Sequence, residues 1–337
     1  MAQYTERGKR LHLAYSFALL TTEHSADHLR KQVQALDSAL DSTDGWGCWA
    51  VSNHDVPRVA SRWSAGNGPD TRRDKLWLSM LLSLRGSACV YQGEELGLPE
   101  AEVPFERLQD PYGRAFWPEF KGRDGARTPM PWLAEAGNGG FNDGQIEPWL
   151  PLYGAHLRLA VDRPPQDPQS MLSFSRELLR WRRQQPLLHG GGIRFLDAAE
   201  PFLHLERYDG DEVLQAVFNL SGQRATLRLD RMLVPLAGSP FLGARMDGDL
   251  ALELPPYGVY MGVPTDGAGW VRPHGVCAGH PRARCIRPPR THRLRGSARK
   301  RSRGLHARSG TLAPGHAGRL LLGRRHRTTR GGQGCRA

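Results

Sequence analysis

The sequence predicts an α/β region, then an all-β region, and finally a basic end that does not fold. In the first 186 residues, short apolar runs alternate with amphipathic segments, an order typical of parallel strands joined by helices. From residue 193 the apolar runs are short, alternating and separated by turn residues, which favours antiparallel strands. From about residue 263 the composition no longer supplies the apolar side chains that a core needs.

The α/β region opens with a strand and a helix. Residues 11–20 form an apolar run that we interpret as a strand. Residues 26–40 follow with helical spacing, directly after Ser25, a residue type that caps helix N-termini. The next strand is expected at residues 46–51.

A strand–helix–strand unit follows, with polar residues at both strand ends. The run at 46–51 leads into Asn-His-Asp at 53–55, and a helix is predicted over 71–84, where Gly86 stops it. A third apolar run, 87–91, ends in Gln-Gly-Glu-Glu. The order predicts three parallel strands, and polar groups at such strand ends usually serve a ligand.

A long connection and a last helix complete the α/β region. Residues 98–167 are rich in Pro, Gly and aromatic side chains, and a connection of that length is usually functional or disordered. Residues 167–185 predict a helix with a basic C-terminal end, which suits the helix dipole, and Pro186 is expected to end it. The antiparallel strands that follow are expected at 193–196, 202–208, 213–220, 225–229 and 252–261.

Three strings of the α/β region together resemble one family. Ser-Asn-His-Asp-Val-Pro-Arg (52–58), Tyr-Gln-Gly-Glu-Glu-Leu-Gly (91–97) and Gly-Arg-Asp-Gly-Ala-Arg-Thr-Pro-Met-Pro-Trp (122–132) are similar to the α-glucosidase and oligo-1,6-glucosidase branch of the α-amylase family. The likeness extends over roughly residues 2–262. It implies a (β/α)8 barrel followed by a β-sandwich, and hydrolysis of α-glucosidic bonds with retention of configuration.

The resemblance implies roles for three residues. Asp55 matches the family's third carboxylate, which grips the sugar hydroxyls and favours the charge-bearing transition state. His54 would donate a hydrogen bond to the same glucose, and Arg58 resembles the arginine that orients that sugar in exo-acting members. The plain structural alternatives are a His packed on a strand end and an Arg paired with a surface acid.

Residues 98–167 resemble the insertion that rims the family's substrate pocket. Arg127 and Trp132 are candidate rim residues, since an indole offers a sugar a stacking face. The alternative is a Pro-stiffened surface loop in which Trp132 only packs. Trp149 is expected to be a packing anchor.

The family's other two carboxylates are expected to be absent. Its nucleophile ends strand four in a Gly-x-Arg-x-Asp string, and its acid is a Glu that ends strand five; residues 1–5 resemble the stretch just after that Glu. The string at 192–197 has the wrong Arg-to-Asp spacing and belongs to a sandwich strand, and Glu94 and Glu95 are expected to be structural. We therefore expect an inactive piece that holds the last three barrel strands and lacks the complementary N-terminal part of the barrel.

The expected domains are a C-terminal barrel portion (1–186) with its rim insertion (98–167), a β-sandwich (187–262) and a disordered tail (263–337). The tail carries eighteen Lys or Arg against one acid, Asp266, so the formal charge of +12 lies entirely in it. The tail is read either as a nucleic-acid-binding arm or as an out-of-frame translation, and the near absence of Lys favours the second reading. Loss of salt-sensitive binding on removal of 263–337 would support the first.

The sequence also bears on ligands and location. No Cys-x-x-Cys string or His cluster indicates a metal or other cofactor, so none is expected. The expected partner is an α-glucoside oligosaccharide; a non-catalytic carbohydrate-binding piece is the alternative. Without a leader or an apolar run of eighteen residues, we expect no membrane association and a cytoplasmic location.

Overall fold

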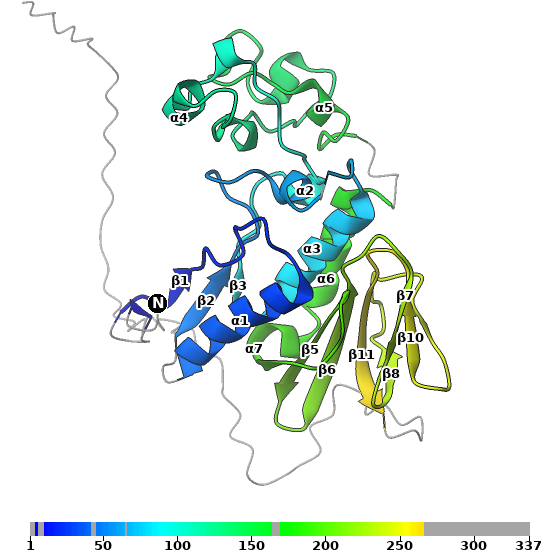
Figure 1. Cartoon of the computed structure of the whole chain (residues 1–337). Coiled ribbons are helices and arrows are strands. Elements are labelled where there is room, and N and C mark those ends of the chain that lie inside the picture. The colour runs from blue at the N-terminus through cyan, green and yellow to red at the C-terminus, as the bar shows by residue number, and fades with distance from the viewer. Residues whose placement is uncertain (1–3, 6–9, 42–44, 65, 164–168, 266–337) are drawn as a thin grey trace, which may run out of the picture. The chain divides into compact units, whose positions relative to one another are not determined.

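The computed structural model describes residues 4–5, 10–41, 45–64, 66–163 and 169–265, all within one compact unit (Figure 1). The predictions for the basic tail lie outside these residues, apart from its boundary. The last strand continues to Thr265, so it includes the first three residues of the segment predicted as the tail.

The three expected parallel strands are confirmed, although each is shorter than its apolar run. β1 (Leu13–Tyr15), β2 (Trp46–Trp49) and β3 (Ser87–Ala88) form a sheet in that order, and both pairs are parallel. The outer strands shorten because only residues opposite a partner in β2 can join the hydrogen-bond ladder.

Helices α1 (Ala26–Asp41) and α3 (Thr71–Ser83) connect these strands, and both begin at a side-chain cap. The Ser25 hydroxyl accepts a hydrogen bond from the backbone of His28, as predicted, and the Asp70 carboxylate accepts one from the backbone of Arg72. A short helix, α2 (Val59–Arg62), follows directly after Arg58. The strand ends and the loop around Asp55 are thereby placed next to the start of α2.

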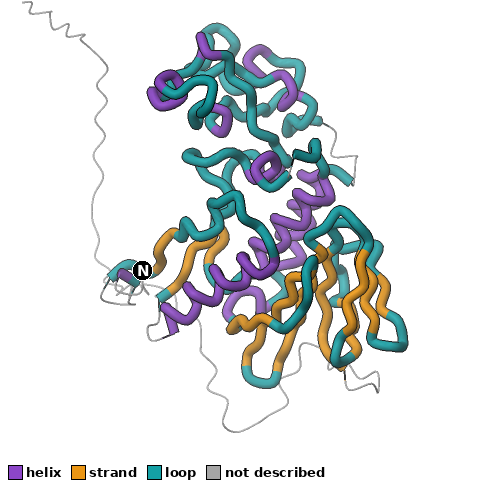
Figure 2. Tube along the Cα trace, viewed as in Figure 1, coloured by secondary structure: helices purple, strands orange, loops and turns teal. Residues whose placement is uncertain are grey.

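The insertion after β3 contains no strand among its described residues (Figure 2). The turn before it contains η2 (Glu94–Leu96), and the insertion's own helices are short: η3 (Phe105–Arg107), α4 (Pro111–Ala115), η4 (Asp124–Ala126), η5 (Gly137–Gly140) and α5 (Gly154–Leu157). Buried carboxylates hold it together instead of a sheet. One oxygen of Asp124 accepts from the backbone of Gln109 at 2.6 Å and of Asp110 at 2.8 Å.

Helix α6 (Met171–Arg182) is the last long helix, and it lies alongside α3 (Figure 1). The expectation that Pro186 ends this helix was wrong, because α6 ends four residues earlier. Pro186 instead begins α7 (Pro186–Gly190), where its missing N–H group costs nothing in the first turn.

Two antiparallel sheets follow. The larger has the order β4-β5-β6-β11-β8 and the smaller β7-β10-β9. Their strands are β4 (Gly192–Phe195), β5 (Phe202–Asp209), β6 (Glu212–Asn219), β7 (Ala225–Arg228), β8 (Met232–Pro235), β9 (Arg245–Met246), β10 (Ala251–Leu254) and β11 (Val259–Thr265).

The run predicted as one strand at 252–261 is two strands, because a turn closed by a hydrogen bond from Gly258 N to Pro255 O separates them. Strands β8 and β9 were not predicted. They have four and two residues, too few to show an alternating pattern.

The larger sheet buries both of its faces. One face packs on the smaller sheet through a cluster that includes Phe202, Val217 and Leu252. The other face carries Leu205 and Phe218 into the core that also contains α1, α3 and α6. The β-region therefore shares part of its core with these helices.

Candidate functional site

Asp55 lies in the loop after β2 and is held by its neighbours. The amide oxygen of Asn53 accepts a hydrogen bond from the Asp55 backbone at 2.8 Å, so Asn53 shapes the loop. The Asp55 side chain is 43 % exposed, which leaves its carboxylate accessible. The His54 ring is also exposed, and its Nε2 lies 3.4 Å from Asp55 Oδ2.

Two arginines of the insertion converge on one oxygen of Asp55. Arg123 Nη1 and Arg127 Nη2 each lie 3.0 Å from Asp55 Oδ1. Arg127 also donates through Nε to the backbone oxygen of His54 at 2.8 Å. These charged hydrogen bonds join the loop after β2 to the insertion.

A second carboxylate, Asp110, orients Arg123. Its side chain is fully buried, and its two oxygens accept from Arg123 Nε at 2.9 Å and Nη2 at 3.0 Å. It also accepts from the backbone N–H groups of Tyr112 and Arg123. These hydrogen bonds, with the Arg123 side chain first, lower the pKa of Asp110 to about 2. Arg123 is therefore preorganised toward Asp55.

Arg58, for which the resemblance predicts a sugar contact, is buried in this structure. It is 2 % exposed, and it donates through Nη1 to Gln92 O at 2.7 Å and through Nη2 to Ala126 O at 3.1 Å. Arg58 does not form the surface ion pair that was the structural alternative, because its side chain is buried and donates to backbone oxygens. In this structure Arg58 supports the loops behind Asp55.

Buried carboxyl groups surround Arg58. Burial raises the pKa of Glu94 and of Glu100 to about 7, and Glu100 accepts from the Arg58 backbone at 2.8 Å. Glu94 is 7 % exposed and accepts from the backbone of Tyr91, while Glu95 accepts from the backbone of Gly93. Both members of the Glu-Glu pair thus shape the turn after β3, in agreement with the structural role expected for them.

Sequence reasoning proposed Asp55 and His54 as site residues, but it did not name Arg123, which contacts Asp55, or Asp110, which holds Arg123. The signal for Arg123 was present in the Gly-Arg-Asp-Gly string, whereas nothing in the sequence pairs Asp110 with it. A Gly-x-Arg-x-Asp string at 243–247 was also overlooked. Its Asp247 accepts hydrogen bonds from the backbone of Asp249 and Ala251, so it forms a turn between β9 and β10.

Both tryptophans of the insertion that were predicted to have a role, Trp132 and Trp149, are exposed. Trp132 is 47 % exposed, which leaves its proposed stacking role open to test. Trp149 is 70 % exposed, so the prediction that it anchors packing was wrong. A local sequence pattern does not reveal whether a large side chain of a loop finds a covering neighbour.

No group of three or more His, Cys, Asp or Glu side chains in the described part of the chain is arranged to hold a metal ion. None of the helices in that part has the length and apolar character needed to cross a membrane.

Comparisons with known proteins agree with the string resemblance. Residues 2–191 match the family model described as the catalytic domain of alpha amylase. A probable alpha-glucosidase of Rhizobium meliloti is 41 % identical over 259 residues, which are 77 % of this chain and 46 % of that protein. A glucan 1,6-alpha-glucosidase of Streptococcus pneumoniae is 30 % identical over 57 % of this chain and 38 % of its own.

Solved structures show the same likeness. The crystal structure of an alpha-glucosyl transfer enzyme, XgtA, superposes with a TM-score of 0.72 at 44 % identity, over 78 % of this chain and 48 % of that one. Trehalulose synthase MutB of Pseudomonas mesoacidophila shares the fold at 23 % identity, with a TM-score of 0.66 over 76 % of this chain and 51 % of its own. The chain thus spans about half the length, or less, of these relatives.

Proposed function

The chain belongs to the α-amylase family, and from that premise we propose that it carries one side of an active site that acts on terminal α-glucosidic bonds of oligosaccharides. In this proposal β1, β2 and β3 are the last three strands of an eight-stranded barrel, and the two antiparallel sheets are its C-terminal β-sandwich. The parallel pairing of the three strands supports the first assignment.

The observation that carries the proposal is Asp55, accessible at a strand end and fixed by two arginines. An ionised carboxylate can accept hydrogen bonds from two sugar hydroxyls and stabilise positive charge that develops at the anomeric carbon. Arg123 and Arg127 both donate to Oδ1 of Asp55, whereas His54 Nε2 lies 3.4 Å from Oδ2. His54 is then placed to contact the same sugar.

Retaining hydrolysis requires two further carboxyl groups about 5 Å apart, a nucleophile and an acid/base. Among the described residues, the carboxylates next to Asp55 are engaged: Asp110 is buried on Arg123, and Glu94 is buried behind the loop. We propose that these 337 residues do not supply the nucleophile and the acid, and that activity requires further barrel polypeptide. The chain alone then binds glucosides at most.

The test is an activity assay with and without complementation. The purified chain should release no glucose from maltose, isomaltose or an aryl α-glucoside above the uncatalysed rate. Mixed or co-expressed with the N-terminal barrel segment of a close relative, it should regain turnover, and Asp55→Asn should lower kcat by at least about a hundredfold. The control is Glu102→Gln, because Glu102 is an exposed carboxylate of the insertion after β3. This variant should keep the activity.

Two outcomes would contradict the proposal. Turnover by the chain alone that Asp55→Asn abolishes would show that it contains the other carboxylates. Full activity of the complemented Asp55→Asn variant would reduce Asp55 to a turn former.

Glucosyl transfer is a second candidate, favoured by the 44 % identity to an alpha-glucosyl transfer enzyme. Transfer and hydrolysis share the first bond-breaking step and differ in whether a hydroxyl acceptor or water completes the reaction. Added alcohol acceptor should then divert product from glucose to a glucoside in the complemented enzyme. A constant glucose yield at all acceptor concentrations would leave hydrolysis as the function.

A further inference from the structure

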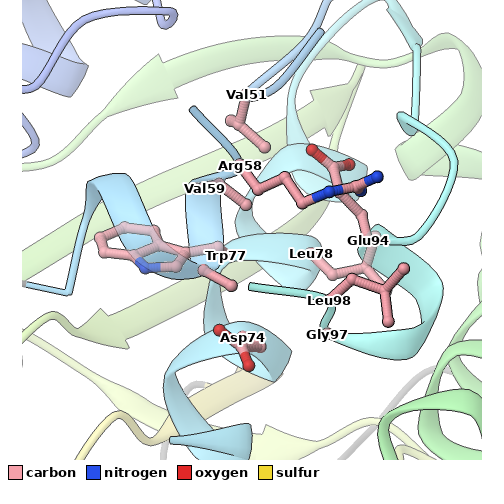
Figure 3. Close-up of a pocket in the computed structure, with 10 residues that line it drawn as sticks. Val51, Arg58, Val59, Asp74, Trp77, Leu78, Glu94, Gly97 and Leu98 are labelled. Carbon is pink, nitrogen blue, oxygen red and sulfur yellow. The ribbon is translucent and has the colours of Figure 1, made fainter. Parts of the chain in front are cut away.

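A small buried cavity lies behind the loop that carries Asp55. Its volume is about 10 Å³, the room of a single water molecule, and Arg58, Asp74 and Glu94 line it together with Val51, Leu78 and Leu98 (Figure 3). The apolar walls cannot satisfy a polar group. Yet Arg58 Nε, Glu94 Oε1 and Asp74 Oδ1 are buried and have no hydrogen-bond partner among the described residues.

We propose that one water molecule occupies this cavity and bridges Arg58 to Glu94, and that this bridged pair positions the loops that hold Asp55. The inference rests on the proposed function only for the role of Asp55. Water suits the site because it can accept from the Arg58 N–H group and donate to the Glu94 oxygen at once. The two carboxyl groups disfavour an anion, and the guanidinium disfavours a cation.

Arg58 connects three segments that are distant in the sequence. It follows Asp55 by three residues, donates to Gln92 O in the turn after β3, and donates to Ala126 O in the insertion. Tyr91 reinforces the connection, since its hydroxyl donates to the same Ala126 oxygen at 2.9 Å. Because Ala126 directly precedes Arg127, the position of Arg58 determines where Arg127 meets Asp55.

The backbone of the turn is built to let Arg58 reach its acceptors. A Cβ atom on Gly93 would lie 2.6 Å from Arg58 Nη1, and the φ of Gly93 is +95°. Only glycine adopts this conformation without strain, and only glycine leaves room for the guanidinium. Arg58 is therefore a positioning residue in this proposal, and it does not touch the sugar.

Hydrogen exchange of the full 337-residue chain tests the positioning role without requiring turnover. In Arg58→Met, amide exchange should accelerate at least about tenfold in residues 53–57, 91–98 and 124–128, because two charged hydrogen bonds are lost. Arg73→Met is the matched control. Arg73 is as buried as Arg58, but it donates to Ala60 O and Gly68 O, outside the three segments.

Two further measurements separate positioning from general stability. In Arg58→Ala, low guanidinium concentrations that do not unfold the chain should restore protection to the three segments, whereas Arg73→Ala should not respond there. Glu94→Gln keeps a polar partner for the water and should exchange like the wild type, whereas Glu94→Met should accelerate the same three segments.

The proposal would be overturned by several results. The first is fast amide exchange of the three segments already in the wild type, and the second is an equal acceleration of exchange in β5 and β6 of Arg58→Met. The third is a failure of guanidinium to restore protection in Arg58→Ala, and the fourth is exchange at the wild-type rate in Glu94→Met. A high-resolution crystal structure with no density between Arg58 Nε and Glu94 Oε1 would remove the bridging water. Because none of these readouts involves a glucoside, they are independent of the activity assay.

Discussion

Single residues of this chain show how burial changes acid–base behaviour. Glu94 has a pKa raised from 4.5 to about 7 by burial, although Ser52 and the Tyr91 backbone oppose the shift by hydrogen bonding to it. A carboxyl whose folded pKa is raised favours the folded state most when it is protonated. The contribution of Glu94 to the free energy of unfolding is therefore fully present below pH 4.5 and is lost as the pH rises through about 7.

We predict that Glu94→Gln reduces the pH dependence of stability in that window. The wild type should lose up to about 3 kcal/mol of unfolding free energy from this group between pH 4.5 and 8, and the variant should not. Asp74 and Glu100 shift in the same direction, so a residual slope will remain. Urea titrations at several pH values, with Glu102→Gln as the exposed control, measure the difference. Parallel curves for wild type and Glu94→Gln would contradict the prediction.

At the scale of elements, the insertion after β3 is held together by buried charged side chains, and its described residues form no sheet. Asp110 caps α4, where it accepts from the Tyr112 backbone, and it holds Arg123 through two side-chain contacts. The same residue thus starts a helix and aims the arginine at Asp55. One substitution should disturb both.

We predict that Asp110→Asn destabilises the insertion by about 1–3 kcal/mol, because it removes a buried acceptor from a charged donor. Arg123 should then lose its fixed orientation, seen as faster amide exchange in residues 110–124 and weaker sugar binding in the complemented enzyme. Glu147→Gln is the control, since its ion pair with Arg107 is exposed and contributes little. Equal thermal stability of Asp110→Asn and Glu147→Gln would show that Asp110 is dispensable.

At the scale of the whole described unit, the α/β part and the β-sheets share one core. Arg207 of β5 is fully buried and donates to Ser83 O at 2.9 Å and Gly191 O at 2.6 Å. It thereby fastens the end of α3 and the start of β4 to the larger sheet. Among the described residues, β1 has a strand partner only in β2, and Leu13 of β1 is 42 % exposed and Phe17 beyond it 66 % exposed.

We predict that residues 1–186 expressed alone aggregate or remain molten. They lose the sheet face that covers α3 and α6, and the small parallel sheet keeps unpaired strand edges. Co-expression with a relative's N-terminal barrel segment should reduce aggregation by covering the edge at β1. Size-exclusion chromatography and amide exchange over residues 46–51 measure this. A monodisperse monomer of 1–186 with cooperative unfolding would show that the segment closes on itself.

The sequence by itself determined the order of the elements, the three parallel strands and the residue Asp55, because these depend on local periodicity, caps and short strings. Strand lengths, the two short strands and the turn at 255–258 depended on pairing partners, which only the tertiary structure supplies. The same holds for Arg58, read from the string as a sugar contact and found buried on backbone oxygens, and for Asp110, which meets Arg123 across a folded loop. Burial and long-range pairing set what these side chains can do, and neither is encoded in spacing along the chain.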